Sequence, residues 1–231
     1  CGVSSVSLIL GRKVWIDMGT YTIFPNLYVV LVAGSGRCRK STAIGQAEKL
    51  VRGVEPTPNI IAQKLTPESL IDAMRTVKGL PATLAAIKRD VCDGVVIVDE
   101  LATFLNRKSY ENGLGPLLIQ FYDCKDNFTY QTKSQGSQHI EKSCLGLLGG
   151  STVDWIRTAI PDEAVGGGLT SRIIFVYVDE PATPVAIPEF DDEKRKTQEK
   201  LLRALRRITL LSGEMTLTAG AKEFFEVEYK S

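Results

Sequence analysis

One stretch of the sequence places glycine, lysine and hydroxyl side chains in an order that suits phosphate binding. The stretch is Gly34-Ser35-Gly36-Arg37-Cys38-Arg39-Lys40-Ser41-Thr42, which fits the pattern G-x-x-x-x-G-K-[ST] at Gly34, Lys40 and Ser41. In such a loop, backbone N–H groups surround the phosphates, the lysine reaches the β- and γ-phosphates, and the hydroxyl group holds Mg²⁺. Residues 34–42 are therefore predicted to bind a nucleotide, with Lys40 at the reacting phosphates and Ser41 as a metal ligand.

The stretch departs from the pattern at Arg39, where the pattern has glycine. Glycine lets the backbone pass close to a phosphate without a clash from a Cβ atom. We expect Arg39 either to take a different backbone conformation or to point its side chain outward. The alternative interpretation is a basic turn between a strand and a helix that binds no nucleotide.

A second candidate is the acidic pair Asp99-Glu100, which directly follows the apolar run of residues 94–98. Hydrolysis of a nucleoside triphosphate needs a carboxylate that holds Mg²⁺ through its water shell and a base that orients the attacking water. We expect Asp99 to serve the metal and Glu100 to serve the water. A solvated acidic turn at the end of a strand is the plainer alternative.

Three further polar residues are candidates for the same site. Ser151 and Thr152 follow another apolar run, and we predict that one of them contacts the γ-phosphate or the attacking water as a sensor. A helix N-cap explains either residue equally well. Arg172 follows a glycine-rich stretch, and an arginine supplied to a neighbouring subunit would neutralise charge in the transition state. The alternative for Arg172 is a structural surface arginine.

The elements that must position these residues alternate between strands and helices. Continuous apolar, β-branched runs are typical of buried parallel strands, and they occur at residues 27–33 and 94–98. Further strands are predicted at 144–148, where the hairpin returns, and at 172–178. Helices are predicted from apolar periodicity and start signals over about 41–51, 66–77, 114–122, 191–208 and 218–229.

This alternation predicts an α/β fold, a three-layer P-loop sandwich with a mainly parallel central sheet. Ligands bind at the carboxyl ends of the strands in such sheets, which is where the phosphate loop, the acidic pair and Ser151 all fall. We expect residues 1–180 to form the nucleotide-binding core. Residues 181–231 are predicted to be a proline-containing linker and a helical segment that packs on the core or extends it.

Residues 128–143 are predicted to form an inserted hairpin with a polar turn at 134–137. Phe128, Tyr130 and His139 occur in it, and three lysines flank or follow them: Lys125, Lys133 and Lys142. Because cations neutralise backbone phosphates and aromatic faces stack on bases, we predict that the hairpin contacts single-stranded DNA, with Lys133 and Lys142 as its phosphate-binding residues. In an ordinary hairpin, the aromatic rings would lie in the core and the lysines in solvent.

The composition narrows the class of protein further. Hydrophobic residues make up 44% and charged residues 24% of the chain, which excludes disordered and fibrous classes. The net charge of +1 gives no general argument for nucleic-acid binding. Five cysteines without a CxxC pair and a single histidine argue against a zinc site and favour free thiols in a reducing cytosol.

No apolar run reaches transmembrane length, so we expect a cytoplasmic protein that makes no membrane contact. The sequence begins with Cys1 rather than Met, and we expect further residues or domains to flank it.

The order of the motifs resembles a family of phage, plasmid and bacterial P-loop proteins that are often described as helicases or primase-helicases. The resemblance runs from about residue 10 to the end of the chain, and its motifs are Pro25–Val32, Ser35-Gly36, Arg39–Thr42, Val98–Leu105, Leu147–Thr152 and Gly166–Arg172. Members of this family can carry arginine before the loop lysine. Thr170-Ser171-Arg172 also looks like the Ser-Arg-Phe arginine-finger motif of minichromosome-maintenance helicases, with Ile173 in place of Phe.

The resemblance implies an ATPase that uses ATP and Mg²⁺, and it leads to three hypotheses. The first is ATP hydrolysis coupled to DNA remodelling or unwinding, by a ring-shaped homo-oligomer in the replication of a phage or mobile element. The second is a nucleotide-dependent switch or loader that acts on a protein partner without motor activity. The third, a small-molecule kinase, lacks any visible substrate lid or acceptor segment.

Overall fold

The structure, a computed structural model, describes residues 1–36, 38–61, 65–75, 91–132, 136–159, 168–179 and 189–230. Its helices are α1 (Gly2–Leu10), α2 (Lys40–Arg52), α3 (Pro67–Arg75), α4 (Leu101–Phe104), α5 (Arg107–Glu111), α6 (Leu114–Tyr122), α7 (Val153–Ala159), the short 3₁₀ helix η1 (Thr170–Arg172), α9 (Asp192–Ile208) and α10 (Ala219–Lys230). Its strands are β1 (Val14–Asp17), β2 (Thr22–Ile23), β3 (Tyr28–Val32), β4 (Ile60–Ile61), β5 (Val91–Val98), β6 (Asn127–Thr132), β7 (Gly136–Ser151), β8 (Ile173–Tyr177) and β9 (Gly213–Glu214).

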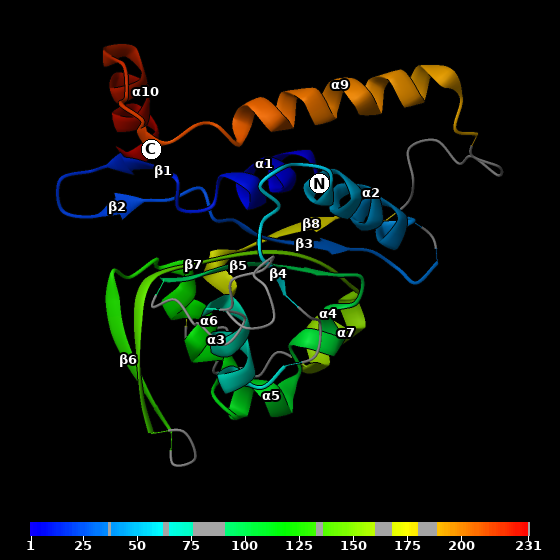
Figure 1. Cartoon of the computed structure of the whole chain (residues 1–231). Coiled ribbons are helices and arrows are strands. Elements are labelled where there is room, and N and C mark those ends of the chain that lie inside the picture. The colour runs from blue at the N-terminus through cyan, green and yellow to red at the C-terminus, as the bar shows by residue number, and fades with distance from the viewer. Residues whose placement is uncertain are drawn as a thin grey trace, which may run out of the picture.

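Among the described residues, five strands form a parallel sheet in the order β4-β5-β7-β3-β8. The predicted α/β fold with a mainly parallel central sheet is therefore confirmed. Parallel strands place their carboxyl ends at one edge, and in Figure 1 this edge is on the right, where β3 leads toward α2. The β1–β2 ribbon and the β6–β7 hairpin lie on the opposite side of the view.

Helices cover both faces of this sheet (Figure 1). Side chains alternate between the faces along each strand: Val29 and Ile97 pack with the core of α1 and α2, whereas Val30 and Val96 pack with the core of α3 and α6. Because the central strands are buried on both faces, their sequences are continuous apolar runs. The molecule is thus layered as helices, sheet and helices.

Helix α1 was missing from the predicted elements. Its residues Leu8 and Ile9 are 2% and 3% exposed and belong to the core that contains α2. The Ser7 hydroxyl group accepts a hydrogen bond from the N–H of Leu27 at 2.9 Å, which ties α1 to the start of β3. Serine and valine are poor helix formers, so the local sequence gives little helix signal and packing on the sheet stabilises the helix instead.

The predicted hairpin is present: β6 pairs antiparallel with the first part of β7, from Asn127↔Glu141 to Thr132↔Gly136. Its tip, residues 133–135 including Lys133, lies outside the described residues. Phe128 and Tyr130 are half-buried and pack against the main core, as the ordinary-hairpin alternative expects, and contact of the hairpin with bases stays a prediction. The Phe128 ring contacts the Phe121 ring with 5.9 Å between centroids.

The C-terminal part of the chain returns to the body of the molecule. Helix α9 packs on α1 and α2, with Leu205 6% exposed, and β9 pairs in parallel with β1 at Val14↔Gly213. The proline-containing residues 181–188 lie outside the described residues. In the ranges that are described, no helix combines the length and the apolar character needed to cross a bilayer.

Candidate nucleotide-binding site

The phosphate loop, the acidic pair and Ser151 meet at the carboxyl edge of the sheet. Strand β7, which ends at Ser151, lies between β3, which leads into the loop, and β5, which leads into Asp99. The register pairs Val32 with Ser151 and Val98 with Gly149, so the three strands end at the same level. Ser151 therefore lies between the strand that leads into residues 34–42 and the strand that leads into Asp99-Glu100.

A glycine allows this close approach of the strands. A Cβ atom on Gly150 would lie 2.4 Å from the carbonyl oxygen of Asp99 and 3.1 Å from Cδ1 of Ile44. The first distance is shorter than close-packed atoms tolerate, so a larger residue would displace Asp99 or the end of β7. Gly150 thus sets where Asp99 lies relative to Ser151.

The loop enters α2 through a residue in the left-handed region. Arg39 has φ 48° and ψ 39°, a conformation that glycine adopts freely and that costs other residues about 1 kcal/mol. This explains why glycine is preferred here in the general pattern. Of our two expectations, the outward orientation fits, because Arg39 is exposed. Arg37 lies outside the described residues.

The N-terminus of α2 suits an anion. Among the described residues no side chain caps this helix, and its first turn contains no acidic residue. Helices α5 and α9, in contrast, are capped by the side chains of Asn106 and Asp191. The N–H groups of the first turn and the helix dipole place partial positive charge at this end. Arg39 and Lys40 add full charges, so the end of α2 favours a phosphate group.

The Lys40 side chain folds back over the loop. Its Nζ donates hydrogen bonds to the carbonyl oxygens of Ala33 at 2.8 Å and Gly34 at 3.1 Å. An ammonium group has three donors, so this position leaves one for a phosphate oxygen. Ser41 and Thr42 are exposed in the first turn of the helix, on the same end that would face the phosphates.

The acidic pair is held by the backbone contacts of Glu100, and its two side chains differ in exposure. The carbonyl oxygen of Glu100 accepts hydrogen bonds from the N–H of Thr103 at 3.1 Å and from its hydroxyl group at 2.8 Å. Asp99 is exposed and Glu100 is half-buried. This arrangement fixes the start of α4 directly after the acidic pair.

No group of three or more His, Cys, Asp or Glu side chains is arranged to hold a metal ion within the described ranges. Mg²⁺ in nucleotide sites is typically held by one or two protein ligands together with phosphate oxygens and water. Ser41 and Asp99 are both exposed at the carboxyl edge of the sheet, and their role as ligands of Mg²⁺ stays a prediction.

The two sensor candidates differ in their surroundings. Ser151 is fully buried, and its carbonyl oxygen accepts a hydrogen bond from the N–H of Ala33, where the loop begins, at 3.3 Å. The Thr152 hydroxyl group accepts a hydrogen bond from the N–H of Trp155 at 3.2 Å and so caps α7. The capping alternative therefore holds for Thr152. The Ser151 hydroxyl group donates to the carbonyl oxygen of Thr152 at 3.4 Å, and its role as a sensor stays a prediction.

Arg172 does not join the site in its own chain. Its Nε and one terminal nitrogen donate to both carboxylate oxygens of Asp123 at 2.8 and 3.2 Å, and the other donates to the carbonyl of Gly168 at 2.9 Å. It precedes Ile173, which pairs with Tyr28 at the start of β3. Arg172 is thus at the amino edge, about 16 Å along the strands from the phosphate loop. It has a structural ion pair here, and its role as a finger in a neighbouring subunit stays a prediction.

Lys142 lies at the root of the hairpin rather than at the nucleotide edge. It is exposed with φ 48°, at an irregularity where the pairing of β5 with β7 shifts register. Its N–H donates to the carbonyl oxygen of Asp126 at 2.8 Å. The side chain of Lys142 is therefore at the surface beside the root, as a contact with nucleic acid would require.

Arg12 was not among the predicted functional residues, but it holds the root of the β6–β7 hairpin in place. Its guanidinium group donates to the carbonyl oxygens of Cys124 at 2.5 Å and Ser143 at 2.9 Å, and it forms an ion pair with Asp126. It also lies 4.5 Å from the centre of the Phe24 ring. The Cys124 and Ser143 partners are 112 and 131 residues away in sequence. No local pattern around Arg12 could have indicated the contacts.

No known protein-family model matches this sequence, and no curated protein is significantly similar to it. The activity must therefore be inferred from the arrangement of the phosphate loop, the acidic pair and Ser151 at one edge of the sheet.

Proposed function

We propose that the protein binds ATP with Mg²⁺ at the carboxyl edge of its sheet, hydrolyses it, and couples hydrolysis to remodelling or unwinding of DNA. The observation that supports the ATPase most is the meeting of three features at one edge: the uncapped N-terminus of α2, Lys40 over the loop, and Asp99-Glu100 one strand beyond Ser151.

Each residue has a role that its position permits. The N–H groups at the start of α2 bind phosphate oxygens, and the Lys40 ammonium group neutralises the β- and γ-phosphates. Ser41 and Asp99 would hold Mg²⁺, which stabilises the charge that develops on the phosphates. Glu100 orients the attacking water and accepts its proton.

The continuity of β7 supports the coupling to DNA. This one strand of sixteen residues begins in the hairpin and ends at Ser151, beside the phosphate loop. A rigid element that connects two sites can transmit a displacement from one to the other. The pairing of β7 with β5 shifts register at residues 142–143, so a change at Ser151 on hydrolysis would be transmitted along the regular part of the strand, residues 144–151, up to the root of the hairpin.

A second candidate function is a nucleotide-dependent switch or loader that acts on a protein partner. Exposed apolar side chains on β8 favour this function, because Ile174 and Tyr177 are 49% and 58% exposed on the strand that ends the sheet within the described residues. An unpaired apolar edge favours association with another chain. The same surface would serve the ring-shaped homo-oligomer that the first proposal includes.

The deciding experiment measures ATP hydrolysis with and without single-stranded DNA, on protein separated by size. Lys40→Ala and Glu100→Gln serve as controls for contaminating ATPases. Turnover that DNA stimulates supports the motor, and turnover that DNA leaves unchanged supports the switch. Wild-type protein with no more turnover than Lys40→Ala would refute both.

A further inference from the structure

A large cleft opens at the amino edge of the sheet, on the side opposite the proposed nucleotide site. Its volume is about 1050 Å³. Its walls are the root of the hairpin, the connection from α1 to β1, the β1–β2 ribbon and the beginning of β5. Figure 1 shows the ribbon and the hairpin on the same side of the molecule, away from the start of α2. No step of the proposed hydrolysis uses this cleft.

When the ion-paired side chains are set aside, more cationic than anionic side chains remain on the walls of the cleft. The lining contains the carboxylates of Asp93, Asp123 and Asp126, but Asp126 is paired with Arg12 and Asp123 with Arg172. Lys125 and Lys142 line the same walls and are exposed.

The two lysines lie close to each other at the hairpin root. The N–H of Lys142 donates to Asp126 O at 2.8 Å, and the N–H of Ser143 donates to Lys125 O at 3.1 Å. Lys13 contributes less, because its Nζ donates to Thr209 O at 3.0 Å and burial lowers its pKa.

Aromatic rings line the cleft beside these lysines. Tyr21 is 57% exposed on the β1–β2 ribbon, and Trp15 on β1 is half-buried. Phe24 also lines the cleft, but the Arg12 guanidinium group covers its ring. At the cleft, the aromatic rings that are available for stacking therefore come from β1 and the β1–β2 ribbon rather than from Phe128 and Tyr130.

We propose that this cleft binds a segment of single-stranded nucleic acid, with phosphates against Lys125 and Lys142 and bases against Tyr21 and Trp15. Lysines beside exposed aromatic rings are the combination that binds single strands without regard to sequence. The proposal rests on the proposed DNA function and extends it, because a strand that follows the hairpin reaches the cleft at the root that Arg12 holds. Nucleotide and nucleic acid then occupy opposite edges of one sheet.

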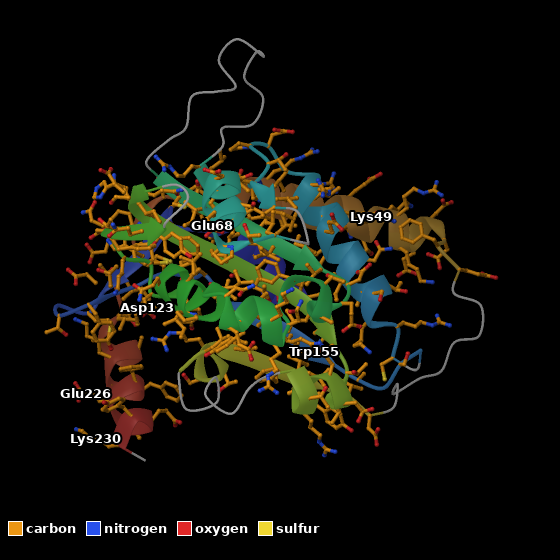
Figure 2. The ribbon with its side chains drawn as sticks, turned by 90° about the horizontal axis from the view of Figure 1, so that it is seen from below. Lys49, Glu68, Asp123, Trp155, Glu226 and Lys230 are labelled. Atoms are coloured by element: carbon orange, nitrogen blue, oxygen red, sulfur yellow. The ribbon has the colours of Figure 1, made fainter. Side chains whose placement is uncertain are left out.

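The two tryptophans of the chain, Trp15 and Trp155, give a direct test. Trp155 belongs to α7, which follows the carboxyl end of β7. In Figure 2 it lies well apart from Asp123, which lines the cleft. Trp155→Phe leaves Trp15 as the single tryptophan emitter, and Trp15→Phe leaves Trp155. Each protein is titrated with unlabelled oligothymidylate and, separately, with oligouridylate, while a labelled oligonucleotide monitors binding by anisotropy.

We expect saturable quenching of Trp15 in the Trp155→Phe protein and no matching change in the Trp15→Phe protein. The relative midpoints for the two oligonucleotides then identify DNA or RNA as the preferred strand. Anisotropy that reports binding while Trp15 emission stays constant would overturn the cleft proposal and leave the proposed DNA function intact. If neither oligonucleotide binds to wild-type protein, the DNA function and the cleft proposal fail together.

Substitutions at two exposed residues, Lys125 and Tyr21, distinguish a contact with phosphates from a contact with bases. Lys125→Ala should weaken binding and reduce the slope of log affinity against log salt concentration by about one unit. Tyr21→Ala should weaken binding about tenfold and leave that slope unchanged. Lys222→Ala, an exposed lysine on α10, is the matched control. Loss of affinity in the control equal to that in Lys125→Ala would contradict the proposal.

Discussion

The carbonyl oxygen of Asp99 lies against Gly150 so closely that a Cβ atom at position 150 would be only 2.4 Å from it. This contact joins the acidic pair to the strand that ends at Ser151. It also gives a physical reason for glycine at position 150, because only glycine lets the two backbones approach so closely. The spacing between Asp99 and the end of β7 at Ser151 thus depends on the absence of a methyl group at Gly150.

Gly150→Ala is therefore expected to destabilise the protein by about 2 kcal/mol and to reduce ATP hydrolysis, since Asp99 must move. Gly149→Ala is the matched control, because its Cβ would meet only side-chain atoms, Val98 Cγ2 at 3.3 Å and Leu101 Cδ1 at 3.4 Å. Denaturant unfolding and turnover should both show the larger loss for Gly150→Ala. Equal effects at the two positions would remove the special role of the Asp99 contact.

Lys40→Ala should abolish ATP hydrolysis, with a loss of about a hundredfold or more. The side chain contacts only carbonyl oxygens of its own loop among the interactions of the described residues, so the fold should persist. Lys49→Ala, an exposed lysine on the same helix (Figure 2), should keep wild-type turnover. Wild-type turnover by Lys40→Ala would refute the phosphate-loop assignment.

The hydroxyl group of Ser41 gives a separate test of the metal. Ser41→Ala should bind ATP more weakly only when Mg²⁺ is present, because the hydroxyl group is expected to hold the ion rather than a phosphate. Nucleotide affinity is measured with Mg²⁺ and with a chelator. A loss of affinity that is the same in both conditions would place Ser41 at the phosphates instead.

Glu100→Gln should still bind ATP and lose turnover by about a hundredfold or more, because the amide keeps the shape of the side chain and cannot accept a proton. The thermal unfolding midpoint should stay close to that of the wild type. If binding and turnover fall together, Glu100 holds the metal and the roles of the acidic pair must be exchanged.

The left-handed backbone at Arg39 predicts a difference between two substitutions. Arg39→Gly removes both the side chain and the conformational cost, whereas Arg39→Ala removes the side chain alone, so the glycine variant should be more stable by about 1 kcal/mol. Nucleotide affinity measured on the same pair shows what the arginine side chain contributes. A glycine variant that is less stable than the alanine variant would contradict the left-handed geometry.

The sequence predicts the existence and type of several elements well, including the central strands that are buried on both faces and the largely exposed helices α9 and α10. The apolar runs that became β3, β5 and the end of β7 indicate strands, and the rule that ligands bind at carboxyl ends then groups Lys40, Asp99 and Ser151 correctly. The strand order, with β7 between β3 and β5, comes only from the structure, because nothing in the apolar runs distinguishes neighbours.

Long-range side-chain contacts escaped prediction for a different reason. Arg12 and Arg172 each find their partners far along the chain, at Cys124, Ser143 and Asp123. A single arginine carries no periodic signal that would show whether it binds a carboxylate of its own chain or a phosphate. Helix α1 was missed because packing on the sheet, rather than local propensity, stabilises it.

A structural role and an arginine-finger role for Arg172 predict different results for the same substitutions. As a structural residue, its bidentate and partly buried pair with Asp123 should stabilise the fold by about 1 kcal/mol. Asp123→Asn should then cost nearly as much as Arg172→Ala, and the double variant should cost little more than either. As an arginine finger, Arg172→Ala should keep nucleotide affinity and lose hydrolysis, while Asp123→Asn keeps both.

A mixing experiment tests the finger role directly. Arg172→Ala protein supplies an intact phosphate loop and Lys40→Ala protein supplies an intact arginine, so a mixed ring would contain interfaces with both. Turnover that reappears on mixing requires that the two residues come from different chains. Because the two residues lie at opposite edges of one sheet, no rearrangement of neighbouring side chains within a monomer could bring them together. Hydrolysis by Arg172→Ala at the wild-type rate, together with the loss of stability shared with Asp123→Asn, would leave Arg172 with its structural role alone.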